Sequence, residues 1–180
     1  MKATGIVRRI DDLGRVVIPK EIRRTMRIRE GDPLEIYTSR DGEVIFKKYS
    51  LLGGVEDFAG QLCETMSRST GSICAVTDRD TVISVAGGGK RELLGKRITS
   101  ELEQIMESRR IYQFTGQEGA IPVSDSTDKL VVSIAAPILS EGDLLGLVLF
   151  ISQAPGTPGG DAEYKLAQTI AAFLGKHMES

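Results

Sequence analysis

Hydrophobic and polar residues alternate in short runs over the first fifty residues, a pattern typical of β-strands. The apolar, mostly β-branched runs lie at residues 5–10, 15–18, 34–37 and 43–46. Pro19 is well placed at the start of a short helix over 20–26, and Asp41-Gly42 between the last two runs predicts a hairpin. Strands this short bury too little surface to be stable alone, so the pattern favours a dimer that shares strands between chains.

The rest of the chain contains longer elements of both types. Helical spacing of apolar residues predicts helices at 55–68, 90–94, 99–108 and 161–178. Strand-like runs lie at 72–77, 81–85, 111–114, 130–139 and 143–153. The polar stretch 117–128 is expected to be a loop. Strands joined by tight turns and flanked by helices predict an antiparallel sheet with helices outside it, so the fold class is α+β.

Charge is distributed unevenly along the chain. The 180 residues carry a formal net charge of −2. Residues 1–50 hold twelve Lys and Arg against eight Asp and Glu, a net charge of +4, which leaves −6 for the remainder. A basic front on an acidic body indicates that the front alone contacts a polyanion. We therefore expect a basic module over 1–50, a short flexible joint over 51–54 and a body over 55–180.

Composition argues against several other classes of protein. The most apolar stretch, 144–151, is too short to span a bilayer, and the N-terminus lacks the apolar core of a secretion signal, so we expect a cytoplasmic protein with no membrane partner. Cys63 and Cys74 have no metal-binding spacing, and His177 is the one histidine, so no metal or cofactor is expected. No Ser/His/Asp set can form around His177, and the chain is not expected to be an enzyme.

The run from Thr4 to Thr25, with the strands 34–37 and 44–49 after it, closely resembles the AbrB family of transition-state regulators. The match covers residues 1–50 almost without a gap. It implies a swapped-hairpin domain, in which two N-terminal segments interleave their strands into one dimer that binds double-stranded DNA.

The continuation into a second domain is similar to an AbrB-type regulator of late, forespore genes in endospore-forming bacteria, whose second part is a GAF domain. That resemblance implies a sporulation regulator on the forespore nucleoid that activates some genes and represses others. It also implies two dimers joined through their GAF domains into a tetramer. GAF domains commonly bind small molecules, so a ligand of unknown identity is an open alternative to a purely structural role.

The resemblance also implies which side chains contact DNA. The DNA-contacting arginines of the family correspond to Arg8, Arg15, Arg23 and Arg24; Arg9 holds a position that is also basic, and Lys2, Lys47 and Lys48 are expected as outer phosphate contacts. The guanidinium fork matches both phosphate and the edge of guanine. No recognition helix of useful length is present, so we expect selectivity to come largely from DNA shape.

Other charged side chains in the front module have simpler interpretations. Solvation, or pairing with Glu30 and Asp32, is expected for Arg27, Arg29 and Arg40, which the resemblance does not support as DNA contacts. Carboxylates also lie among the arginines, and we interpret Asp11 and Asp12 as turn residues and Glu21 as a helix-end charge rather than as an acid–base set.

In the body, residues 87–89 are three consecutive glycines, but they lack the Lys-Ser/Thr of a phosphate-binding loop and are expected to be a plain loop. Cys74 is expected to be a buried core thiol rather than a pocket wall or chromophore anchor. His177 is expected to be a helix-end cation. The helices 55–68 and 161–178 are amphipathic, and their pairing between two chains would join two DNA-binding dimers and raise avidity.

Three functions compete at this point. The first is a sequence-tolerant transcription regulator. The second is an antitoxin, since the same fold serves in toxin–antitoxin pairs, although those proteins carry a short disordered toxin-binding tail in place of a folded domain. The third is an enzyme with a basic anion site, for which no catalytic set is visible.

Overall fold

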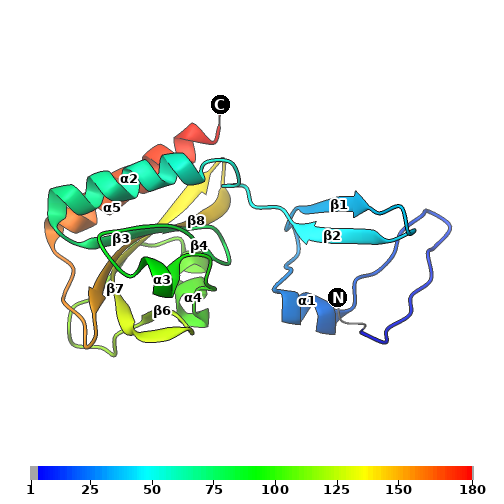
Figure 1. Cartoon of the computed structure of the whole chain (residues 1–180), viewed down its shortest axis with the longest axis horizontal. Helices are drawn as coiled ribbons and strands as arrows, with labels where there is room; N and C mark the ends of the chain where they lie inside the picture. The colour runs from blue at the N-terminus through cyan, green and yellow to red at the C-terminus, as the bar shows by residue number, and fades with distance from the viewer. Residues whose placement is uncertain (1–3, 180) are drawn as a thin grey trace. The chain divides into compact units, whose positions relative to one another are not determined.

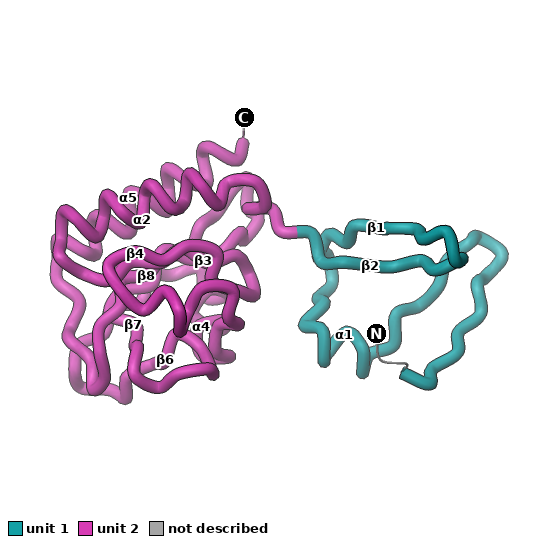
Figure 2. The backbone as a smooth tube through the Cα atoms, viewed as in Figure 1, with its two compact units in different colours: residues 1–49 teal, residues 50–180 magenta. Residues whose placement is uncertain are grey.

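The structure, a computed structural model, describes residues 4–179. It divides into two compact units, residues 1–49 and residues 50–180 (Figure 2). The boundary lies close to the end of the basic front module. Lys2 lies outside the described residues. Within the part of the chain that is described, no helix is long and apolar enough to cross a membrane.

Among its described residues, 4–49, the first unit contains one helix and one hairpin (Figure 1). The helix is α1 (Lys20–Met26), and the strands are β1 (Leu34–Thr38) and β2 (Val44–Lys48). Pro19 precedes α1, and Arg27 ends it in the left-handed conformation, with its N–H donating to the Arg24 carbonyl. β1 and β2 pair antiparallel around the turn that contains Gly42, whose φ of +80° favours glycine. The expected helix and hairpin are therefore present.

The segment before α1 differs from the prediction. Residues 5–10 and 15–18, predicted as strands, form no ladder with any of the described residues 4–179 and run as a long open arm (Figure 1). In the described part of this segment, two backbone hydrogen bonds span the turn: Asp11 N–H to the Arg15 carbonyl and Gly14 N–H to the Asp11 carbonyl. A strand needs a neighbour for its N–H and C=O groups, and the single chain supplies none here.

The second unit is an antiparallel sheet between two pairs of helices, which confirms the α+β fold class. Its strands are β3 (Ile73–Thr77), β4 (Val82–Ala86), β5 (Tyr112–Gln113), β6 (Pro122–Ser124), β7 (Thr127–Ser140) and β8 (Asp143–Gln153). Its helices are α2 (Glu56–Thr70), α3 (Lys90–Leu93), α4 (Ser100–Ser108) and α5 (Asp161–His177). The strand order is β4-β3-β8-β7-β5, with β6 paired to β7.

Two apolar layers hold this unit together. One lies between the sheet and the pair α2 and α5, and it contains Cys63, Phe150 and Leu174. The other lies on the face that carries α3 and α4 (Figure 1). Leu52, in the segment expected to be a flexible joint, is fully buried in the first layer. The second unit therefore includes residues that precede α2.

The two cysteines are free and buried in the first layer, as expected for core thiols. Burial raises the pKa of Cys63 to about 11 and that of Cys74 to about 12. Both side chains therefore stay as neutral thiols at physiological pH, and the thiolate that redox chemistry or metal binding requires is disfavoured.

The stretch 117–128, predicted to be a loop, contains β6 and the start of β7. Val123 and Ser124 are buried there, and Ser124 also forms a bridge with Ile98. The sequence did not predict this short strand because just one of its three residues, Val123, has a large apolar side chain. The prediction of a loop is wrong over these residues.

Candidate nucleic-acid interface

The predicted DNA-contacting side chains gather on the first unit. The exposed ones among those that are described are Arg8, Arg9, Arg15, Arg23, Arg24 and Lys47. Arg8 precedes the 11–15 turn and Arg15 ends it, while Arg23 and Arg24 lie in the last turn of α1. The structure thus places four predicted arginines on two local features of one small unit.

The 11–15 turn is built around the carboxylate of Asp11. Its Oδ1 accepts hydrogen bonds from the backbone N–H of Leu13 at 3.0 Å and of Arg15 at 2.8 Å. Its Oδ2 accepts from Arg15 Nε at 2.8 Å. These hydrogen bonds, that from the Arg15 backbone foremost, hold the pKa of Asp11 below its usual range. Asp11 is therefore a turn residue, as predicted, and it also orients an arginine.

Arg23 is oriented in a different way. Its Nε donates to the Ile18 carbonyl at 3.2 Å, just before α1 begins. A neutral carbonyl leaves the charge of this guanidinium uncompensated, whereas Asp11 compensates that of Arg15. Glu21 lies in the first turn of α1, which agrees with its expected role as a helix-end charge.

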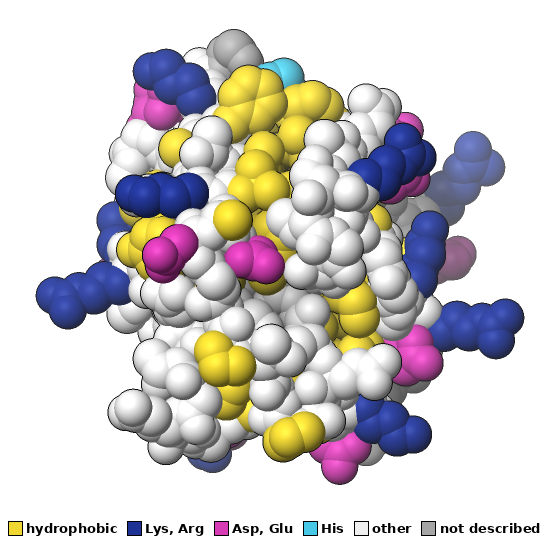
Figure 3. Space-filling model, turned by 90° about the vertical axis from the view of Figure 1, so that its left-hand side faces the viewer, with side chains coloured by type: hydrophobic (Ala, Val, Ile, Leu, Met, Phe, Trp, Pro, Cys, Tyr) yellow, Lys and Arg dark blue, Asp and Glu magenta, His cyan; other side chains and the backbone are white. Residues whose placement is uncertain are grey.

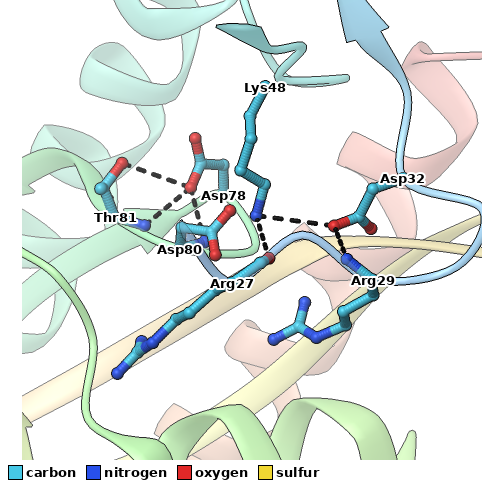
Figure 4. Close-up of polar contacts among 7 residues, drawn as sticks. All are labelled: Arg27, Arg29, Asp32, Lys48, Asp78, Asp80 and Thr81. Carbon is cyan, nitrogen blue, oxygen red and sulfur yellow. Dashed lines mark hydrogen bonds and ion pairs between the residues drawn. The ribbon is translucent and has the colours of Figure 1, made fainter. Parts of the chain in front are cut away.

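The two lysines of β2 have different surroundings. Lys47 is exposed, with its Nζ 4.7 Å from the centre of the Tyr37 ring. Lys48 is half-buried, and its Nζ donates to the Arg27 carbonyl at 2.8 Å and lies 3.6 Å from Asp32 Oδ2 (Figure 4). The same Asp32 oxygen accepts from the Arg29 backbone N–H at 2.9 Å. Lys48 thus has a structural role in holding the segment after α1.

The first unit has almost no interior. Of its described residues, 4–49, Pro19 alone is buried. Large hydrophobic side chains are instead exposed at Ile6, Val7, Ile10, Leu13, Val16, Val17, Met26, Ile36, Tyr37, Val44, Phe46 and Tyr49. An apolar set of this size on forty-six residues is typical of a surface that another chain covers.

The second unit has a cavity beside its three consecutive glycines. The described residues contain no group of three or more potential metal ligands. A cavity of about 410 Å³ beside residues 87–89 is lined by Glu92, Lys129 and Gln153 among others. A Cβ at position 87 would lie 2.7 Å from the Ser72 carbonyl oxygen, and φ is +85° there, so packing and backbone conformation explain the glycine. The Asp78 carboxylate caps the β3–β4 turn by accepting from the N–H groups of Asp80 and Thr81 (Figure 4).

Comparisons with known proteins agree with this division. Residues 54–179 match the family described as stage V sporulation protein T C-terminal, transcription factor. Residues 7–50 match the family described as antidote-toxin recognition MazE, bacterial antitoxin. The chain is 45% identical over 179 residues to the stage V sporulation protein T of Bacillus subtilis, and the alignment covers 99% of each chain.

One further relative and two solved structures match one part of the chain each. The transition state regulatory protein AbrB of B. subtilis is 63% identical over 49 residues, which cover 27% of this chain and 50% of that one. The solved N-terminal DNA recognition domain of the same protein is 61% identical, covers 27% of this chain and 91% of its own, and has a TM-score of 0.23. The solved GAF domain/HD domain protein of Geobacter sulfurreducens is 17% identical, covers 71% of this chain and 96% of its own, and has a TM-score of 0.49.

These matches define the class of the chain as a transcription factor with an AbrB-like N-terminal domain. Within that class, the chain belongs to the stage V sporulation protein T family.

The contacts that orient Arg15 and Arg23 were not predicted from the sequence. An aspartate four residues before an arginine, across a turn that contains Gly14, was the available signal for the first. No signal in the sequence pointed to the Ile18 carbonyl.

Proposed function

We propose that this chain regulates sporulation genes, activating some and repressing others, by binding double-stranded DNA through a strand-swapped dimer of its first unit. The observation that carries the proposal is the coincidence, on residues 4–49, of exposed arginines with an uncovered apolar surface. The resemblance of the whole chain to a two-domain regulator of forespore genes extends the proposal to the forespore nucleoid as the place of action.

The apolar surface supports dimerisation first. The open arm carries exposed β-branched residues at Ile6, Ile10 and Val16, which have no ladder partner in the part of the chain that the structure describes. A second copy can supply both the missing strands and the missing interior. A dimer formed in this way carries two sets of the predicted DNA-contacting arginines, and both sets then contact one duplex.

The arginines support DNA as the ligand. Positive side chains that contact phosphates release counterions, and this makes binding depend strongly on salt. Arg8, Arg9 and Arg24 are exposed, and the structure records no acidic partner for them among the described residues. The relative whose solved domain is named a DNA recognition domain is 61% identical over this part of the chain.

Salt-dependent binding to a 30-base-pair duplex tests this function. We expect Arg24→Gln and Arg8→Gln each to reduce the slope of log K against log salt by about 1.8, because a dimer loses two phosphate contacts. Arg40→Gln removes the same charge from the exposed tip of the β1–β2 hairpin and should leave the slope unchanged. Equal slopes for all three variants and the parent would contradict the proposed site.

For the second unit we propose assembly, ahead of ligand sensing, as the function. In the apolar layer on its α3 and α4 side, Leu93, Leu102 and Leu147 are all fully buried. On the α2 and α5 side of the unit, Phe58, Phe173 and His177 form an aromatic cluster. The ring centroids of Phe58 and Phe173 lie 5.9 Å apart, and those of Phe58 and His177 lie 4.8 Å apart. Figure 3 shows hydrophobic side chains gathered beside this histidine.

The cluster joins α2 to α5, and Phe173 is 50% exposed. Pairing of these helices between two chains would cover it and join two dimers into a tetramer. Phe173→Lys is then expected to raise the tetramer–dimer dissociation constant at least about thirtyfold, as for loss of a central aromatic contact. Sedimentation equilibrium measures this constant.

Gln168→Lys is the matched control for that variant, because it adds the same charge to an exposed position on another side of α5. A tetramer that survives Phe173→Lys intact, or that both variants weaken equally, would place the assembly surface elsewhere.

A further inference from the structure

The contacts of Arg15 set it apart from the other arginines of the first unit. Its Nε is bound to Asp11 Oδ2 at 2.8 Å, while its side chain stays 70% exposed. Among the described residues the structure records no partner for its Nη1 and Nη2 atoms. One edge of the guanidinium is therefore fixed to the turn, and the remaining edge faces solvent.

Asp11 also changes the charge that Arg15 presents. The carboxylate and the guanidinium form a neutral pair, and the Asp11 side chain is 38% exposed beside it. A phosphate placed against this pair would meet a repelling carboxylate as well as an attracting cation. Arg23 is held by the neutral Ile18 carbonyl and keeps its full charge. The two arginines are both oriented, but the first is poorly suited to phosphate.

A base edge makes the opposite demands on its ligand. Bidentate recognition of guanine O6 and N7 requires a guanidinium held in a defined direction, whereas it requires no net charge. Phosphate contacts set affinity and tolerate a range of side-chain positions, while base contacts set specificity. A fixed, charge-compensated arginine thus fits a base edge better than it fits the backbone.

We propose that Asp11 is a positioning residue that makes Arg15 a guanine-reading contact, while Arg8, Arg9, Arg23 and Arg24 contact phosphates. The inference rests on the proposed DNA-binding function and assigns different roles within that site. In a dimer, two such pairs would read guanine edges at two places on one duplex. Specificity would then depend on a pair that contributes nothing to the net positive charge.

The experiment uses the full-length protein and duplexes with a random 20-base-pair core, enriched by binding to the parent protein. Methylation of guanine N7 and ethylation of phosphates are mapped as interference with binding. Asp11→Asn is the key variant, because its Oδ1 can still accept from the Leu13 and Arg15 N–H groups, whereas an amide nitrogen cannot accept from Arg15 Nε. The double variant Asp11→Asn/Arg15→Gln removes the pair without changing net charge.

We expect guanine N7 interference with the parent and its loss in the double variant, with phosphate interference and the salt slope retained. Asp11→Asn alone should lower discrimination between enriched and random duplexes about a hundredfold, because the dimer loses two base contacts and each corresponds to about tenfold. Its binding to random duplex should be at least as strong as that of the parent. Thermal unfolding should be unchanged in this variant, since the side-chain Oδ1 of residue 11 still accepts from the Leu13 and Arg15 N–H groups.

Arg24→Gln is the control for the opposite behaviour: it should lose phosphate interference, reduce the salt slope by about 1.8 and keep the guanine signals. The inference is overturned if the parent gives no guanine interference, if the double variant keeps it, or if the double variant behaves like Arg24→Gln. If Arg24→Gln still loses phosphate interference and reduces the salt slope in those cases, DNA binding by the first unit stands and only the role of the Asp11–Arg15 pair is wrong.

Discussion

Replacing Gly175 with alanine is expected to lower the free energy of unfolding of the second unit by about 3 kcal/mol, the upper range for forcing an atom into a packed interior. A Cβ at this position would lie 1.9 Å from the Leu139 carbonyl oxygen. That oxygen belongs to the backbone of β7 and cannot rotate away as a side chain can. α5 would have to move off the sheet, which would also disturb the Phe58–Phe173 cluster that α5 carries.

Gly60→Ala is the matched control, because it makes the same change in a helix of the same unit. A Cβ at position 60 would meet Ser84 Oγ at 3.6 Å, an ordinary contact. Alanine has the higher helix propensity, so this variant should gain up to about 1 kcal/mol. Urea unfolding followed by circular dichroism measures both changes. Equal stability of Gly175→Ala and the parent would mean that α5 does not pack against β7 at this distance.

Val16→Asp is expected to separate the dimer of the first unit and to abolish duplex binding with it. In an extended strand Val16 and Ile18 face one side and Val17 the other. Val16 is 43% exposed and Ile18 half-buried, whereas Val17 is 69% exposed. If a second copy covers the Val16 side, an uncompensated carboxylate is buried there, at a cost of about 3 kcal/mol or more. The dimer dissociation constant then rises more than about a hundredfold.

Val17→Asp introduces the same charge one residue later, on the opposite side of the strand. We expect it to change stability by about 0.5 kcal/mol or less, as for an ordinary surface substitution. Sedimentation equilibrium and duplex binding are measured for both variants. Dimers that tolerate Val16→Asp, or that respond equally to both substitutions, would show that this arm does not pair with a second chain as proposed.

Elements with a strong local signal could be predicted from the sequence. Pro19 and the Asp41-Gly42 turn marked α1 and the β1–β2 hairpin closely. The predicted helix 161–178 corresponds to α5 (Asp161–His177). In each case turn chemistry and hydrophobic spacing agree with each other, and the neighbours that the element needs lie in the same unit.

Features that depend on distant or external partners could not be predicted in this way. Residues 15–18 have strand composition, yet they form no strand in the single chain, because a ladder requires a second strand that the chain does not supply. β6 was missed because Val123 is its one large side chain in the core, and its place is set by β7. At the candidate site the arginines were predicted from the resemblance to the AbrB family, whereas the hydrogen bond between Asp11 and Arg15 became evident in the structure.

The exposed apolar set of residues 4–49 has a consequence for the level of the protein in the cell. If a second copy completes this unit, the amount of paired module rises with the square of the chain concentration while most chains are single. A twofold change in synthesis would then produce about a fourfold change in binding-competent dimer. The rate at which the gene is expressed would thereby become an input to regulation, without any ligand.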